Sequence, residues 1–208
     1  CCYNLESSVN AQNYGADRIE LCDNAYEGGT TPSFGLIRKV REKIRIDLNV
    51  IIRPRGGNFI YSEDEFDIMI KDIQTLKQTG IDGIVTGILN IENKIDIERT
   101  KILVEEAFPL PVTFHRAFDV CSEDPDTAIE KVIKSGAKKL LTSGMKKFAS
   151  EGISTIKKLV KNYHDQIDII AGSGITSENI KRIIDQTGVY ELHSSARSLK
   201  FDFLTGKD

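Results

Sequence analysis

The chain is poor in cysteine, lacks tryptophan and contains no long hydrophobic run. Only 4 of its 208 residues are cysteines, at positions 1, 2, 22 and 121. They form neither a CxxC pair nor the dense spacing of a disulfide scaffold, which favours a reduced, cytoplasmic setting. No apolar segment approaches the length of a membrane-spanning helix, so we expect no membrane association.

An excess of charge of one sign is also missing. Lys and Arg number 28 and Asp and Glu number 31, so the net charge is -3 and no basic surface for nucleic acid is expected. With 40% hydrophobic residues and 5 prolines, the composition is that of a soluble globular protein. Because 208 residues fill one core but are few for two, we expect a single domain over residues 1–208.

Four glycines repeat one pattern, in which a helix-like segment ends and a short apolar run follows. These expected helix C-caps are Gly15, Gly80, Gly136 and Gly188. Further strand candidates lie between them at 47–52, 111–114 and 168–171, and residues 1–3 would be the stub of a first strand truncated at the N-terminus. Strict alternation of strands and helices predicts an α/β fold with a parallel sheet, and eight units predict a (β/α)8 TIM barrel. An open doubly wound sheet is the alternative.

Helix starts are also marked in the sequence. Ser62 and Glu65 form a capping box before an amphipathic stretch, and Asp124 precedes a proline at a first helical position. Thr176 similarly precedes the helix that runs toward Gln186.

The glycine repeats also predict which side chains share a face. The fifth residue after each glycine is Glu20, Val85, Leu141 or His193. In a barrel, alternate strands supply one layer of interior side chains, so Glu20 and His193 should share a layer. Cys22, two residues beyond Glu20, would then lie near the barrel mouth.

Two arginines follow the run at 47–52. Because Arg53 and Arg55 are two residues apart, we expect them on one face of strand three, where two guanidinium groups could bind a phosphate or carboxylate. The alternative is a structural ion pair with Glu20 or Asp119.

The run at 111–114 ends in His115 and Arg116, with Asp119 three residues later. His115 could be a general acid or base oriented by Asp119 or Glu20, and Arg116 could add to anion binding. A satisfied core histidine is the alternative, and both interpretations apply to His193. His164 is expected on the surface, away from the site.

A third group of polar residues follows the last two strands. Gly172, Ser173 and Gly174 close one strand and open a helix, so their amides could hold an anion, and Ser194 and Ser195 add hydroxyls. Loops after strands seven and eight are the usual phosphate site of a TIM barrel. The alternative is that the glycines only permit a tight turn.

Two of the cysteines are candidate metal ligands. Cys1 and Cys22 would lie at the ends of neighbouring strands about 4.8 Å apart, close enough for their sulfurs to meet. Soft thiolates select copper(I) or zinc. The alternative is that the cysteines are small buried hydrophobic residues.

Six stretches together resemble the CutC family, which is named for copper homeostasis. They are GADRIELC, EGGTTPS, RPRGGNFIYS, PVTFHRAFD, LTSG and ELHSSAR, and the resemblance runs from Cys1 to Arg197. It implies a (β/α)8 barrel, a cytoplasmic protein and a homo-oligomer, either dimer or tetramer, with no organic cofactor. Two cysteines proposed as copper(I) ligands in animal members correspond to Cys1 and Cys22.

Two functions therefore remain open. The first is copper homeostasis of the CutC type, with copper(I) bound through Cys1 and Cys22. The second is an enzyme, of open reaction class, acting on a small phosphorylated or carboxylated metabolite at the C-terminal mouth of the barrel, with His115 or Glu20 transferring a proton. Fold alone does not decide between them.

Overall fold

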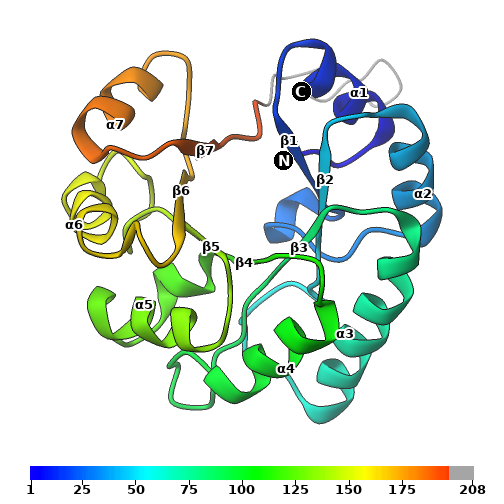
Figure 1. Ribbon diagram of the computed structural model, residues 1–208, viewed down its shortest axis with the longest axis horizontal. Helices are drawn as coiled ribbons and strands as arrows, with labels where there is room; N and C mark the ends of the chain where they lie inside the picture. Colours follow the sequence, from blue (N-terminus) through cyan, green and yellow to red (C-terminus); the bar gives the residue numbers. More distant parts are fainter. Residues whose placement is uncertain (197–208) are drawn as a thin grey trace.

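A computed structural model describes residues 1–196 as a curled, parallel sheet of seven strands surrounded by helices (Figure 1). The strands, hydrogen-bonded in sequence order, are β1 (Arg18–Leu21), β2 (Asp47–Ile51), β3 (Gly83–Thr86), β4 (Val112–Phe114), β5 (Lys139–Thr142), β6 (Asp168–Gly172) and β7 (Glu191–His193). The α-helices are α1 (Leu5–Asn13), α2 (Phe34–Lys43), α3 (Glu63–Leu76), α4 (Ile97–Ala107), α5 (Pro125–Lys134), α6 (Ile153–Tyr163) and α7 (Ile180–Thr187). Short 3-10 turns are η1 (Ala25–Glu27), η2 (Lys77–Thr79) and η3 (Arg116–Val120). No helix within residues 1–196 is both long and apolar enough to cross a bilayer.

This arrangement confirms the predicted TIM-barrel-like fold, but the expected first strand is reduced to one isolated bridge. Cys2 pairs in parallel with Leu21, and its backbone nitrogen donates to the carbonyl of Glu20 at 2.8 Å. The backbone nitrogen of Cys1 donates to the carbonyl of Ser194 at 2.6 Å. The stub is too short for a ladder because the cap of α1, Asn4, follows almost at once. It nevertheless joins the end of β7 to β1.

Most of the predicted helix boundaries are confirmed. The four repeat glycines all have φ between +77° and +89°, the left-handed conformation that a helix C-terminus favours. The capping box of Ser62 and Glu65 is present, and the Asp124 side chain accepts from two amides of α5. The predicted helix start at Thr176 is too early, because residues 176–179 form a turn, in which the amides of Asn179 and Ile180 donate to the carbonyl of Thr176, and α7 starts at Ile180.

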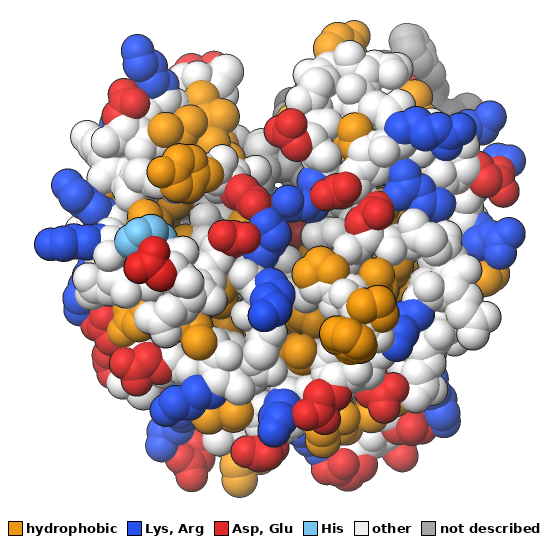
Figure 2. Space-filling model, viewed as in Figure 1, with side chains coloured by type: hydrophobic (Ala, Val, Ile, Leu, Met, Phe, Trp, Pro, Cys, Tyr) orange, Lys and Arg blue, Asp and Glu red, His pale blue; other side chains and the backbone are white. Residues whose placement is uncertain are grey.

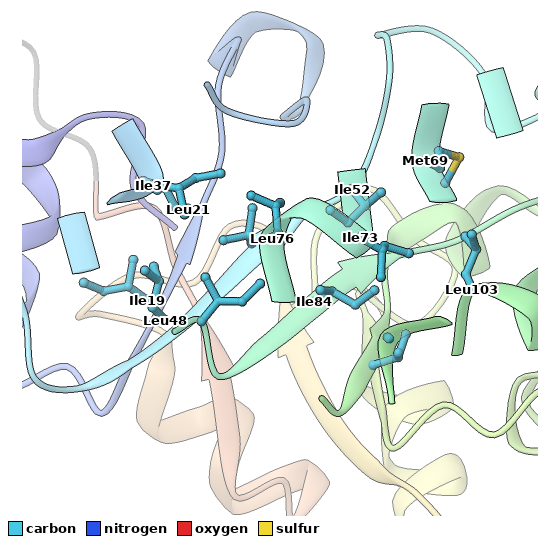
Figure 3. Close-up of a cluster of buried hydrophobic side chains, with 14 of the residues drawn as sticks. Ile19, Leu21, Ile37, Leu48, Ile52, Met69, Ile73, Leu76, Ile84 and Leu103 are labelled. Carbon is cyan, nitrogen blue, oxygen red and sulfur yellow. The ribbon is translucent and has the colours of Figure 1, made fainter. Parts of the chain in front are cut away.

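Alternate residues of each strand point outward and pack under the helices. Figure 3 shows this on one side of the ring, where strand residues meet the faces of α2, α3 and α4. The side chains in contact include Ile19, Leu48 and Ile84 from strands and Ile37, Ile73 and Leu103 from helices. A second buried cluster joins β4, β5 and β6 to α5, α6 and α7. This packing leaves the other residues of each strand facing the interior of the ring.

Interior ion pairs link strands at their amino ends. Arg18 of β1 contacts Glu191 of β7 at 2.6 Å, and Lys139 of β5 contacts both Glu191 and Asp168. Figure 2 shows acidic and basic side chains gathered in the middle of the displayed face, between hydrophobic patches. The Arg18–Glu191 pair spans the gap between the first and last strands, so it helps to close the ring.

Candidate functional site

The side chains predicted to share a face do point into the ring. Paired residues of parallel strands face the same side, and so do alternate residues along each strand. The observed register places Glu20, Val85, Leu141 and His193 on the interior face. Glu20 and His193 meet across the β7–β1 gap, with Oε2 and Nε2 separated by 3.1 Å. The predicted shared layer is therefore confirmed.

Glu20 is a largely buried carboxylate with two polar neighbours. The Cys22 thiol donates to its Oε1 at 3.4 Å, and His193 lies beside its Oε2. Burial alone would raise the pKa of Glu20, but the charge of nearby His193 and the hydrogen bond from Cys22 outweigh it and lower the pKa to about 2. Glu20 is therefore a fixed negative charge at neutral pH, suited to hold and orient His193.

Arg53 lies just beyond β2 and is 4% exposed. Its guanidinium donates to the carbonyls of Glu27 at 2.6 Å, Gly29 at 2.8 Å and Gly57 at 2.7 Å. The structural ion pair considered for it, with Glu20 or Asp119, is not formed. Its hydrogen bonds therefore connect the loop after β1 to the loop after β2. No carboxylate within residues 1–196 lies at ion-pair distance from Arg53.

Arg55 does not share a strand face with Arg53, because β2 ends at Ile51 and both arginines lie in the following loop. The Arg55 Nε donates to Oε1 of Glu65 at 2.5 Å, and its guanidinium lies over the Tyr61 ring. Glu65 is the acidic member of the capping box of α3. Of the two arginines in this loop, Arg55 therefore pairs with a carboxylate and Arg53 does not.

His115 follows β4 and is 5% exposed. Its Nδ1 accepts a hydrogen bond from the amide of Ala117 at 3.2 Å, which caps η3, and its Nε2 is buried without a hydrogen-bond partner among the described atoms. Burial, reinforced by the charge of Arg53, lowers the pKa of His115 to about 4. Because Nδ1 accepts, the neutral ring carries its proton on Nε2. His115 is thus a neutral hydrogen-bond donor at pH 7.

Asp119 does not orient His115. Its buried carboxylate accepts from Thr142 Oγ1 at 2.5 Å, from the amide of Ser143 at 2.9 Å and from the amide of Met145 at 3.0 Å. Arg116 Nε donates to it at 2.8 Å. Asp119 therefore fixes the loop after β5, and Arg116 is drawn into the same network. The sequence could not reveal this, because the donors at the end of β5 and in the loop after it lie more than twenty residues away in the chain.

The loops after β6 and β7 line an open hollow of about 720 Å³. Its walls are Ser173, Gly174, Ile175, Thr176, Ser177, Ile180, His193, Ser194, Ser195 and Ala196. The Ser194 hydroxyl donates to the carbonyl of Ile175 at 2.9 Å, which joins the two loops. Gly174 has φ +68°, and a Cβ there would lie 2.7 Å from the Phe148 ring, so this position requires glycine. Gly172, at the end of β6, lies next to His193 in register.

The two candidate metal ligands share the interior face. The Cys2–Leu21 bridge places Cys1 beside Glu20, and alternate residues of β1 bring Cys22 to the same face. Burial, followed by the charge of Glu20, raises the pKa of the Cys22 thiol well above its usual range. The described residues contain no group of three or more His, Cys, Asp or Glu side chains that could hold a metal ion.

Two residues that were not among the predicted site residues shape this site. Phe59 packs against both Arg53 and His115, and Gly87 leaves the space that the His115 ring occupies. An aromatic residue within the polar loop after β2 and a glycine directly after β3 were the available signals. The surface position predicted for His164 is confirmed, since its side chain is 59% exposed.

Comparison with known proteins gives one consistent result. The profile of the CutC family matches residues 1–198. A CutC protein from Glaesserella parasuis serovar 5 is 45% identical, and the match spans 95% of this chain and 81% of that protein. A CutC protein from Salmonella agona is also 45% identical, over 94% of this chain and 78% of that protein.

A crystal structure of a CutC protein from Streptococcus agalactiae, named for copper homeostasis, is 37% identical with a TM-score of 0.86, and the match spans 93% of this chain and 95% of that one. N-acetylmannosamine-6-phosphate 2-epimerase from Clostridium perfringens shares the fold alone: it is 17% identical with a TM-score of 0.59, over 90% of this chain and 75% of that one.

Proposed function

Because the chain belongs to the CutC family, we propose that it is a cytoplasmic copper homeostasis protein that takes copper(I) as its cargo through Cys1 and Cys22. The observation that carries this proposal is the placement of both cysteines on the interior face beside Glu20. The name of the Streptococcus agalactiae relative supplies the link to copper.

The donor set suits a soft monovalent ion. Thiolates select copper(I) over hard cations, whereas magnesium and calcium require six or more oxygen ligands. The Cys22 thiol must lose its proton on binding, since only the thiolate is a strong ligand. The negative charge of nearby Glu20 would offset part of the positive charge that the ion brings into the ring.

A copper(I) competition titration against a chelator tests this proposal. We expect Cys1→Ser and Cys22→Ser each to weaken binding by at least tenfold, because each removes one of two sulfur ligands. Cys121→Ser is the matched control, since Cys121 lies in the loop before α5 and contacts the carbonyl of Glu123. Parental affinity in both Cys1→Ser and Cys22→Ser would contradict the proposal.

A second candidate is an enzyme acting on a small phosphorylated or carboxylated metabolite. The hollow between the loops after β6 and β7 favours it, because His193 lines the hollow and is held by Glu20. His193 would transfer a proton, and the loop of Gly172, Ser173 and Gly174 with Ser195 would bind the phosphate. A substrate carboxylate would lie deeper in the ring.

Inorganic phosphate is the probe for this second candidate. A titration followed by the amide NMR signals of Gly174 and Ser195 should show saturable shifts that sodium chloride at equal ionic strength does not produce. Ser195→Ala should weaken the response, whereas Ser154→Ala, on the exposed face of α6, should not. Identical responses to phosphate and chloride would argue against the phosphate site.

Family resemblance also leads us to propose a homo-oligomer, either a dimer or a tetramer. Sedimentation equilibrium of the purified protein tests this assembly, and a single monomeric species at micromolar concentration would contradict it.

A further inference from the structure

Arg53 is a buried cation whose hydrogen bonds do not neutralise its charge. Its three described acceptors are backbone carbonyls, which are dipoles rather than anions. Its Nε is buried without a hydrogen bond among the described residues, and the buried hydroxyl of Tyr61, which also lies near Arg53, is neutral and brings no compensating charge. Since burying an unpaired charge is costly, a buried arginine of this kind calls for a compensating anion.

A second unpartnered donor lies close by on His115. Its Nδ1 is occupied by the amide of Ala117, so the Nε2 proton is the group left to donate. An unsatisfied buried donor destabilises the folded state, and a ligand oxygen that accepts from it recovers that loss. Arg53 and His115 thus present two buried N–H groups and one net positive charge.

The strand register brings these two residues to one place. Arg53 comes two residues after Ile51, whose partner Val85 is two residues before Gly87. The amide of His115 donates to the carbonyl of Thr86, so His115 flanks Gly87 on the other side. A Cβ at Gly87 would lie 2.6 Å from His115 Nδ1. The glycine therefore lets the imidazole lie across β3 toward the Arg53 side.

One aromatic side chain covers both groups. The Phe59 ring centroid lies 4.8 Å from Arg53 Cζ and 4.8 Å from the centroid of the His115 ring. The backbone carbonyl of Phe59 accepts from the amide of Leu89 at 2.9 Å, which fixes this loop to the segment after β3. Excluding water with an apolar ring strengthens hydrogen bonds to charged groups.

We propose that Arg53 and His115 together bind the carboxylate group of a small ligand inside the barrel mouth. Arg53 supplies the compensating charge and its Nε–H, and His115 supplies its Nε2–H. This inference rests on the second candidate function above, and it deepens that function by naming the carboxylate as the group recognised in the ring. It also changes the role expected for His115, from proton transfer to hydrogen-bond donation.

The charges in the ring favour a monoanion over a phosphate dianion at this position. Arg55, the second arginine of the loop, is already paired with Glu65, so Arg53 alone supplies positive charge. Ionised Glu20 lies near enough to act on the charge of His115, and it would repel a second negative charge. Two N–H donors also match the two oxygens of one carboxylate.

Sodium acetate is the probe, and the Arg53 Nε–H signal of the intact protein in ¹⁵N NMR is the readout. We expect a saturable shift of this signal with acetate and none with sodium chloride at equal ionic strength. His115→Asn should weaken acetate binding by about tenfold or more, because it removes one charge-assisted hydrogen bond. Asparagine keeps an oxygen that can accept from the Ala117 amide, so the cap of η3 survives. His164→Asn, the same change at an exposed histidine, should leave binding unchanged.

The outcomes separate this inference from the proposed functions. If acetate leaves the Arg53 signal unmoved, or if His115→Asn binds acetate as tightly as the parent, the carboxylate site is wrong. Phosphate shifts at Gly174 and Ser195 report separately on the enzyme candidate, and the chelator titration reports on copper. Acetate binding that persists when phosphate produces no shift would support the carboxylate site and count against the phosphate loops.

Discussion

Lowering the pH should destabilise the protein through His115. The folded state lowers the pKa of this residue from 6.5 to about 4, chiefly by burial. As the pH falls, the unfolded chain therefore binds the proton first. The contribution of the neutral imidazole to the free energy of unfolding is present above pH 6.5 and is lost as the pH falls toward 4. With these two pKa values, the free energy of unfolding should drop by about 2 kcal/mol between pH 7 and pH 5, and by about 3 kcal/mol once the pH is below 4.

Urea unfolding at pH 7 and pH 5 measures this effect. Far-ultraviolet circular dichroism suits the assay because the chain has no tryptophan. We expect His115→Asn to remove most of the 2 kcal/mol difference, whatever its absolute stability, since asparagine does not titrate. His164→Asn should keep the pH dependence of the parent, because its imidazole is exposed. Equal losses of unfolding free energy between the two pH values in the parent and in His115→Asn would rule out His115 as the source of the pH dependence.

Two further substitutions follow from the packing. Gly87→Ala should lower the free energy of unfolding by about 1–3 kcal/mol, because the added methyl group meets the His115 ring. Gly35→Ala, where a Cβ meets nothing within 4 Å, should leave the stability unchanged or raise it. Thermal unfolding measures both, and equal melting temperatures of the two variants would contradict this prediction. Asp119→Asn should lower the free energy of unfolding in urea by about 3 kcal/mol, since it replaces a buried carboxylate that several donors share. Asp126→Asn removes a more exposed ion pair, so it should lower the free energy of unfolding by less than about 1 kcal/mol. Similar losses in both would show that the Asp119 network contributes little.

The interior layer was predictable because it depends on strand periodicity. Four glycine-led repeats set the register, and a period of two then placed Glu20 and His193 on one face, where they meet at 3.1 Å. The same reasoning placed Cys22 on that face. It needed no knowledge of loop conformation.

The partners of loop side chains could not be predicted in this way. Arg53 and Arg55 look alike in sequence, but β2 ends before both of them, and the capping carboxylate of Glu65 engages only Arg55. Asp119 was expected to serve His115, yet amides of the loop after β5 hold it. Periodicity does not specify how a loop closes, so these contacts emerge only when distant segments meet.

Copper K-edge X-ray absorption of the intact protein, loaded with one equivalent of copper(I), identifies the atoms bound to the ion. We expect a first shell of sulfur from Cys1 and Cys22, with one sulfur lost in Cys22→Ser and none lost in Cys121→Ser. A first shell made only of nitrogen and oxygen, unchanged in Cys22→Ser, would contradict the two-cysteine site.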